Sequence, residues 1–173
     1  MFFISDTHFG HKAIVRYEPI FRPFQTVEEH DEELVKRWNS VVHPKDKVFH
    51  LGDAVFGKRN IPILGRLNGF IHLIMGNHDV YGIDEYMQYV DKISGMVEYH
   101  NGLILTHAPL HSNQVGDGKH YWANVHGHLH SKNYTDSRYV NVSCEQVNLT
   151  PVPLDEVWNR ASAWGKGADE TYG

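Results

Sequence analysis

Five short clusters of carboxylate, amide and imidazole side chains recur along this chain of 173 residues, and each cluster follows an apolar run. In order, the clusters are Asp6-Thr7-His8, Gly52-Asp53, Gly76-Asn77-His78-Asp79, Thr106-His107 and Gly127-His128-Leu129-His130. Aspartate, asparagine and histidine without a thiolate are suitable ligands for divalent metal ions such as Mn²⁺ and Zn²⁺. One such cluster arises often by chance, but five in one chain predict a shared metal site.

The spacing within two clusters has a physical reason. Asp6 and His8 are two residues apart, so on an extended strand end both side chains point to one side and can hold one ion. His128 and His130 repeat this spacing. A glycine stands directly before a candidate ligand in three of the clusters, where the missing Cβ lets the backbone turn sharply and approach an ion closely. The pattern therefore predicts a tight site.

The composition is that of an ordinary globular protein, with 41% hydrophobic and 21% charged residues. The length suits a single domain over residues 1–164, followed by a flexible tail over residues 165–173, where small and polar residues replace the apolar pattern. The sequence contains neither an apolar run of about 20 residues nor a secretion signal, so we expect a cytoplasmic protein. The lone Cys144 agrees with a reducing compartment, and we expect it to be a buried strand residue.

Charge and histidine content narrow the functional classes. The net charge of -5 gives no general attraction to phosphate backbones, so extended nucleic acid is a disfavoured partner. Lys58, Arg59 and Arg66 form the one candidate basic patch. The chain has 14 histidines, a residue suited to metal ligation and to proton transfer near neutral pH. These features favour metal-dependent chemistry on a small substrate.

The elements that must position the clusters follow from hydrophobic periodicity. In the first half, buried strands are predicted at Phe2–Ser5, Lys47–Leu51 and Ile71–Met75. A helix is predicted from Val27 to Val42, with a capping box formed by Thr26 and Glu29. A second helix is predicted from Pro62 to Gly69. This alternation predicts parallel strands joined by right-handed crossovers.

The second half changes character. The strands Met96–Tyr99 and Leu103–Thr106 flank Asn101-Gly102, a pair that favours a tight hairpin turn because both residues accept positive φ. Further elements are the strands Asn124–His126 and Tyr139–Ser143 and a last helix over Asp155–Ala163. The sum predicts an α/β fold of two packed sheets flanked by helices. In such sheets ligands gather beyond the carboxyl ends of the strands, where the five clusters lie.

The order and spacing of the clusters resemble the calcineurin-like metallophosphoesterase superfamily, whose signature runs DxH, GD, GNH followed by Asp or Glu, a separate His, and GHxH. All five blocks are present in order between Asp6 and His130. The resemblance implies a two-sheet sandwich covered by helices and a centre of two divalent ions. Carried over by position, one ion would be held by Asp6, His8, Asp53 and His130, and the second by Asp53, Asn77, His107 and His128.

The resemblance also implies a chemistry. Two ions about 3.5–4 Å apart bind phosphoryl oxygens, neutralise developing charge and lower the pKa of a bridging water, so that hydroxide forms near pH 7. His78, next to Asn77, resembles the general acid of the family, which protonates the leaving oxygen. Mn²⁺ is the expected metal, and Fe, Zn²⁺ and Ni²⁺ also suit the ligand types.

Departures from the family signature narrow the branch. The Ser/Thr protein phosphatases continue GD as GDxVDRG and read GNHE, whereas here Phe56 replaces the acidic residue and Asp79 replaces the glutamate. The arginine that follows is also missing. The chain therefore looks more like the small bacterial and phage phosphodiesterases or phosphatases, which lack large cap domains. Asp79 is a candidate for orienting His78.

These features predict a hydrolase acting on a small, nucleotide-like phosphoester, either a diester or a monoester. The alternative within the same superfamily is a nuclease, which the acidic charge balance disfavours. A metal-binding scaffold without catalysis would lack a ligand or the general acid, and the sequence lacks neither. The oligomeric state, the natural substrate and the choice between diester and monoester stay open at this level.

Several other residues have two interpretations. His11 could touch substrate, although a solvated loop histidine is the simpler interpretation. Lys58 and Arg59 could bind a phosphate or be solvated. His111 and His120 lie in the long loop between two ligand blocks, where recognition residues are common. His50 and His126 are expected to pack within their strands. Structural or exposed positions are expected for His30, His43, His72 and His100.

Overall fold

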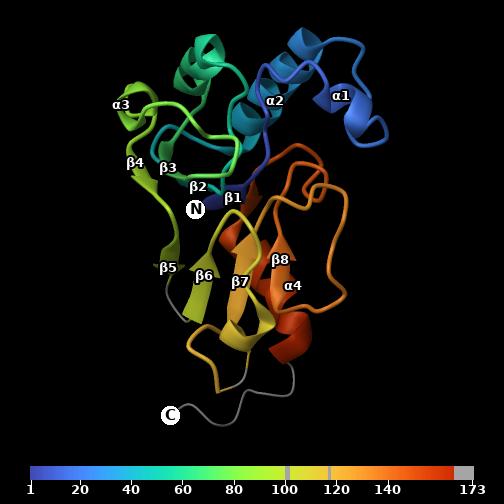
Figure 1. The fold of residues 1–173 in the computed structure, drawn as a ribbon, viewed down its shortest axis with the longest axis vertical. Coiled ribbons are helices and arrows are strands. Elements are labelled where there is room, and N and C mark those ends of the chain that lie inside the picture. The colour runs from blue at the N-terminus through green and yellow to red at the C-terminus, as the bar shows by residue number, and fades with distance from the viewer. Residues whose placement is uncertain (100–101, 117, 166–173) are drawn as a thin grey trace.

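Two sheets form the centre of the computed structural model, which describes residues 1–99, 102–116 and 118–165 (Figure 1). The first sheet has five strands in the order β4-β3-β2-β1-β9, and the second has four in the order β5-β6-β7-β8. Helices lie outside both sheets, so the predicted two-sheet α/β architecture is confirmed.

The first sheet consists of β1 (Phe2–Ile4), β2 (Lys47–His50), β3 (Phe70–Ile74), β4 (Lys92–Ser94) and β9 (Val152–Pro153). Strands β1 to β4 pair in parallel, as the sequence predicts, and β9 pairs antiparallel to β1. Strands β4 and β9 were not expected, because runs of two or three residues leave too little periodicity to detect. The parallel strands bring their carboxyl ends to one edge of the sheet.

Helix α2 (Val27–Val41) connects β1 to β2 and buries its apolar face. The Thr26 side chain accepts the backbone N–H of Glu29 at 3.1 Å, which caps the helix as predicted. The Glu29 carboxylate accepts the backbone N–H of Gln25, one residue before the position that a capping box requires. Buried Trp38 anchors the helix and donates its indole N–H to the Asn68 carbonyl.

The second predicted helix is wrong in type and in boundary. The segment is a 3-10 helix, η1 (Lys58–Arg66), which begins four residues before Pro62 and ends three before Gly69. Gly57, at φ 88°, precedes η1 and turns the chain into it. Pro62 supplies no N–H inside this segment, which works against a regular α-helix. Short helices also occur at α1 (Ile14–Tyr17), α3 (Ile83–Tyr86) and η3 (Ser112–Gln114).

The second sheet consists of β5 (Val97–Tyr99), β6 (Leu103–Leu105), β7 (Ala123–His126) and β8 (Tyr139–Asn141). The antiparallel pairing of β5 with β6 confirms the predicted hairpin, although Asn101 of its turn lies outside the described residues. Strands β6, β7 and β8 are parallel. Helix α4 (Leu154–Gly165) contacts β8 and β9, and Figure 1 shows it beside β8. The predicted flexible tail falls largely on residues 166–173, which are not described.

One apolar core joins the two sheets. The ring of Phe3 on β1 stacks on Phe49 of β2, and both rings meet Tyr99 of β5 edge-on, at centroid distances of 6.4 and 5.7 Å. Cys144 is buried as expected, but it lies in a turn after β8 and not in a strand. Ser5 and Ser143 form a parallel bridge between the sheets. This bridge brings the loops after β1 and β8 together.

The fold also bears on membrane crossing and on the candidate basic patch. Among the described residues, no helix combines the length and apolar character that crossing a membrane requires. The candidate basic patch is not formed as an open cation surface, because Lys58 pairs with Glu85 and Arg66 pairs with Glu32 at 2.7 Å.

Candidate metal centre

The candidate ligands follow the carboxyl ends of five parallel strands. Asp6 and His8 follow β1, Asp53 follows β2, Asn77 follows β3, His107 follows β6, and His128 and His130 follow β7. Backbone hydrogen bonds fasten the loops to one another, since the N–H groups of Asp6 and His8 donate to the carbonyls of Gly52 and Asp53 at 3.0 Å. The His128 N–H donates to Oδ2 of Asp6 at 2.9 Å, so the loops after β1 and β7, one from each sheet, meet at the candidate site.

Three of the side chains form a first group of ligand atoms. The Nε2 atom of His8 lies 3.9 Å from Oδ1 of Asp6, and Nε2 of His130 lies 3.8 Å from the same oxygen. The Nε2 atom of His8 also lies 3.7 Å from Oδ2 of Asp53. These separations exceed a hydrogen bond. They suit two atoms on one ion, because bonds of about 2.0–2.2 Å place the ligand atoms of one ion about 3–4 Å apart.

A second group lies beside the first and shares Asp53 with it. The Nε2 atom of His107 lies 3.4 Å from Oδ2 of Asp53 and 3.0 Å from Oδ1 of Asn77. The Nδ1 atom of His128 lies 3.2 Å from Nε2 of His107. Asp53, His107 and His128 thus place one ligand atom each within 4.8 Å of the others, as do Asp6, His8 and His130. The structure brings all seven predicted ligands together.

Unpartnered buried atoms test whether this arrangement suits metal ions. Oδ1 of Asp6 and both ring nitrogens of His8 are buried and have no hydrogen-bond partner among the described residues. A buried polar atom without a partner costs roughly 1–3 kcal/mol. A divalent cation between Asp6 and His8 would satisfy these atoms, and the oxygen and nitrogen donor set suits such an ion. The first group therefore fits a metal.

The backbone at the candidate ligands is held in a conformation that non-glycine residues seldom adopt. Positive φ angles occur at Asp6 (57°), His8 (49°), Asp53 (53°), His128 (68°) and His130 (51°). Such strain persists where the surroundings enforce it, and it concentrates at functional sites. The sequence predicted that an extended strand end points both side chains of each pair to one side, and this prediction was therefore wrong. Left-handed turns, and not an extended strand end, bring each Asp-x-His or His-x-His pair into the site.

The glycines within the clusters leave space for close approach, as predicted. A Cβ on Gly52, at φ 94°, would lie 2.6 Å from the backbone nitrogen of Gly76. A Cβ on Gly76 would collide with the carboxylate of Asp53. Both positions therefore exclude any side chain.

The shared carboxylate and its imidazole neighbour form a charged pair. Burial raises the pKa of Asp53, but the hydrogen bond and charge of His107 outweigh burial and lower that pKa to about 2. Burial in turn lowers the pKa of His107, but Asp53 and Asp6 raise it to about 9. A proton on His107 thus occupies the place between these side chains that a cation could take. Metal and proton should compete there.

Two buried charged residues that the sequence patterns missed support His130. Oε1 of Glu145 lies 3.2 Å from Nδ1 of His130 and accepts a hydrogen bond from Nε of Arg22 at 2.7 Å. Arg22 is fully buried and also donates to the carbonyls of Asp6 and Thr7. A carboxylate on the outer nitrogen of a ligating histidine fixes its tautomer and orientation. Neither residue belongs to a motif, and the one hint is an arginine within the apolar run IFRPF.

Asp79 has a different role from the one suggested by sequence. Its carboxylate accepts the backbone N–H groups of Asp53, Ala54 and Gly76 at 2.7 to 3.0 Å. The Tyr86 hydroxyl donates to it as well, at 3.4 Å. Asp79 therefore holds the loops after β2 and β3 against each other. Its carboxylate accepts its hydrogen bonds from these groups and not from the His78 ring.

His78 stands at the exposed side of the centre. Its backbone N–H donates to Oδ1 of Asp53 at 2.8 Å, and its ring centroid lies 5.7 Å from that of His8. The residue is exposed, so its ring is accessible to a ligand. This position is compatible with proton transfer to a group bound at the centre.

The remaining sequence candidates have contacts of several kinds. His11 lies near the centre, with its ring 5.3 Å from that of His8. His120 pairs with Glu98 on β5, and His111 accepts the backbone N–H of Asn113. The expected burial is confirmed for His50 and His126. His30 is buried against Arg22, and His100 lies outside the described residues.

Comparisons with known proteins agree with this geometry. The pattern of the calcineurin-like phosphoesterase family matches residues 1–170. An uncharacterised protein of Methanocaldococcus jannaschii, MJ1445, is 38% identical over 169 residues, covering 90% of this chain and 87% of that protein. The Gene 66 protein of Mycobacterium phage L5 is 30% identical over 161 residues, covering 75% and 76%.

A solved structure shares the fold. The protein of unknown function AQ665 from Aquifex aeolicus is 25% identical, with a TM-score of 0.73, and the match covers 92% of this chain and 97% of that one. The family match spans nearly the whole chain and includes every cluster of candidate ligands. The chain therefore belongs to the calcineurin-like phosphoesterase family.

Proposed function

We propose that this protein is a phosphoester hydrolase that uses two divalent metal ions and acts on a small, nucleotide-like phosphodiester or phosphomonoester. The observation that carries the proposal is the pair of overlapping ligand groups that share Asp53. Asp6, His8 and His130 would complete one site, and Asn77, His107 and His128 the other. When bound, the ions would supply Lewis-acid polarisation of the phosphoryl group and a water of lowered pKa. Mn²⁺ is the expected metal.

The protein's own groups have distinct tasks in this proposal. Asp53 has its two oxygens divided, because Oδ2 faces His8 and His107 while Oδ1 accepts the His78 N–H. This hydrogen bond fixes the backbone of His78, whose ring would donate a proton to the leaving oxygen. Asn77 and His128, both exposed, leave the second ligand group open toward a substrate.

A nuclease of the same superfamily is the alternative, and the net charge of -5 argues against a long polyanionic substrate. Hydrolysis of bis(p-nitrophenyl) phosphate and of p-nitrophenyl phosphate should be measured with Mn²⁺ and after chelation. We expect metal-dependent turnover of at least one ester and none after chelation. Turnover that is unchanged by chelation, or no turnover of either ester by the Mn²⁺-loaded protein, would contradict the proposal.

A further inference from the structure

Four ring-bearing side chains lie in a row beside the candidate centre. We call these residues, Tyr17, His11, Phe56 and His78, the ring row. The centroid distances are 6.1 Å from Tyr17 to His11, 4.0 Å from His11 to Phe56 and 5.4 Å from Phe56 to His78. The planes of His11 and Phe56 differ by 12°, so these two rings are stacked. The row ends at His78, next to His8 of the first ligand group.

Tyr17, Phe56 and His78 of the row are exposed to solvent and His11 is partly buried, although all four lie next to a polar site. Tyr17 is 71% exposed and Phe56 is 37% exposed. Single exposed apolar side chains are common on protein surfaces and need no function. Here, however, the Phe56 ring lies 6.3 Å from that of His8, so an exposed aromatic side chain borders the candidate ligands.

The loops that carry the two stacked rings are fastened together. Phe9 and Val55 form a parallel bridge, and the Phe56 N–H donates to the Phe9 carbonyl at 2.8 Å. The Asn60 amide donates to the Phe56 carbonyl at 2.7 Å. A Cβ on Gly10 would collide with Asn60, so the two loops also pack closely. The stacked pair is therefore preorganised and loses little conformational freedom when a ligand binds.

We propose that Phe56 and His11 form a stacking site for a nucleobase of the substrate. This inference rests on the proposed function, because the phosphoryl group of the same substrate would lie at the metal centre. Stacking of one base on an aromatic side chain changes affinity by about 5- to 150-fold. Any base can stack, so the site selects nucleotides as a class.

Charges near the row suit an anionic nucleotide. Lys12 follows His11, Arg59 lies three residues after Phe56, and Arg16 precedes Tyr17. All three cations are exposed, and none forms an ion pair within the described part of the chain. The same nucleobase and phosphate chemistry occurs in a free nucleotide and at the end of a single strand. The net charge of -5 favours the free nucleotide.

The test compares two ligands that differ only in the base. Titration calorimetry of the Mn²⁺-loaded protein should be performed with adenosine 5′-monophosphate and with ribose 5-phosphate. We expect the nucleotide to bind at least about tenfold more tightly. Phe56→Leu, which keeps apolar volume but removes the ring, should abolish most of this difference and leave ribose 5-phosphate binding unchanged.

Phe70→Leu is the matched control, because Phe70 is 52% exposed and begins β3 at the end opposite the ligands. It should retain the full preference for the nucleotide. Equal binding of the two ligands by the unmodified protein, or an equal loss of both in Phe56→Leu, would overturn the stacking site. A ten-nucleotide oligothymidylate distinguishes a free nucleotide from the end of a single strand. If it bound more tightly than adenosine 5′-monophosphate at 0.15 M salt, the assignment to free nucleotides would be overturned.

A metal-free measurement separates this inference from the proposed function. Phe56→Trp adds a fifth tryptophan, within the row. Adenosine should quench the emission of the chelated variant more than that of the chelated unmodified protein, whereas ribose should quench neither. Quenching without any metal-dependent hydrolysis would leave the stacking site intact and reject the proposed function. Metal-dependent hydrolysis without quenching or base preference would reject the stacking site alone.

Discussion

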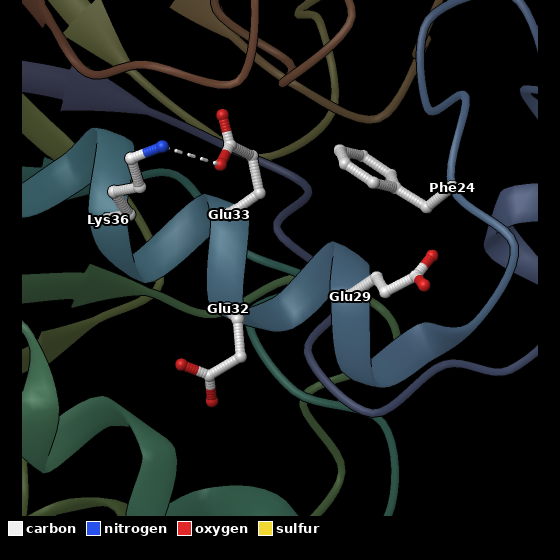
Figure 2. Close-up of a pocket in the computed structure, with 5 residues that line it drawn as sticks. All are labelled: Phe24, Glu29, Glu32, Glu33 and Lys36. Carbon is white, nitrogen blue, oxygen red and sulfur yellow. Dashed lines mark hydrogen bonds and ion pairs between the residues drawn. The ribbon is translucent and has the colours of Figure 1, made fainter.

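Carboxylates gather in two regions of this molecule with opposite properties. One is the candidate metal centre around Asp6 and Asp53. The other is a shallow hollow on the surface of α2, lined by Phe24, Glu29, Glu32, Glu33 and Lys36. Figure 2 shows the hollow with Phe24 facing the helix and Lys36 directed toward Glu33. The hollow is lined by three glutamates, against two aspartates among the candidate ligands, yet none of these glutamates is buried.

The two regions differ in the hydrogen-bond partners and in the burial of their polar side chains. In the hollow, Glu33 accepts hydrogen bonds from Arg37 and Lys36, and Glu32 pairs with Arg66. These exposed ion pairs satisfy the carboxylates in solvent and contribute little to stability. In the centre, a carboxylate oxygen of Asp6 and both ring nitrogens of His8 are buried without hydrogen-bond partners in the described part of the chain. Buried atoms without such partners, and not acidic residues by themselves, therefore distinguish the candidate metal centre.

The largest expected difference between the two regions is the loss of hydrolysis rate when a carboxylate of each is replaced. Asp53→Asn keeps the shape of the shared residue but removes its charge, so both ligand groups lose their common anion. We expect hydrolysis to fall by more than about a thousandfold, because several kcal/mol of transition-state stabilisation are lost. Glu33→Gln in the hollow should leave the rate unchanged. Comparable losses in the two variants, measured with p-nitrophenyl esters and Mn²⁺, would remove the contrast.

A second prediction concerns His78 at the open side of the centre. His78→Ala should slow hydrolysis of an ester with an alkyl leaving group by about a hundredfold, because an alkoxide needs a proton donor. Hydrolysis of a p-nitrophenyl ester should change far less, since p-nitrophenolate leaves without protonation. Steady-state rates on both esters check this. An equal loss on the two leaving groups would mean that His78 is not the general acid.

A third prediction tests the support of His130. Burial raises the pKa of Glu145, but His130 and Arg22 outweigh it and lower that pKa to about 2. Glu145→Gln should therefore weaken Mn²⁺ binding at one site by about 10- to 100-fold, because the outer carboxylate orients the ligand. Glu156→Gln is the control, since Glu156 pairs with Arg160 on the surface of α4. Calorimetric titration that shows the same small change in both variants would contradict this role.

A fourth and smaller prediction concerns acid stability. Burial lowers the pKa of His50 to about 3 and that of His126 to about 4, below the value of about 6.5 in an unfolded chain. Their neutral forms therefore stabilise the fold above pH 6.5, and this stability is lost as the pH falls from 6.5 toward 4 and 3. Each ring contributes up to about 1.4 kcal/mol per pH unit in this window.

The acid prediction can be measured by urea unfolding of chelated protein between pH 7.5 and 4.5. His126→Gln should reduce the pH slope, whereas substitution of the exposed His43 by alanine should leave it unchanged. An unaltered slope in His126→Gln would show that the buried ring does not titrate as described.

Sequence reasoning identified the candidate ligands because their types and spacing form a pattern, and it predicted the parallel strands of the first sheet because each of these clusters follows an apolar run. It could not reach Arg22 and Glu145, which lie far apart in the sequence and meet only in the folded chain. It also misjudged the backbone. Asp6 and His8 have left-handed φ angles that tertiary contacts impose, and no local propensity of these residues predicts them.

The number of bound metal ions decides whether the centre holds two ions through Asp53. Chelated protein should be titrated with Mn²⁺ by calorimetry, and the bound metal counted by elemental analysis after removal of free ions. We predict two ions per chain, one ion tightly bound in His130→Ala, and loss of both in Asp53→Ala. A chain that binds no ion, or an Asp53→Ala variant that still holds both, would contradict a two-metal centre shared through Asp53.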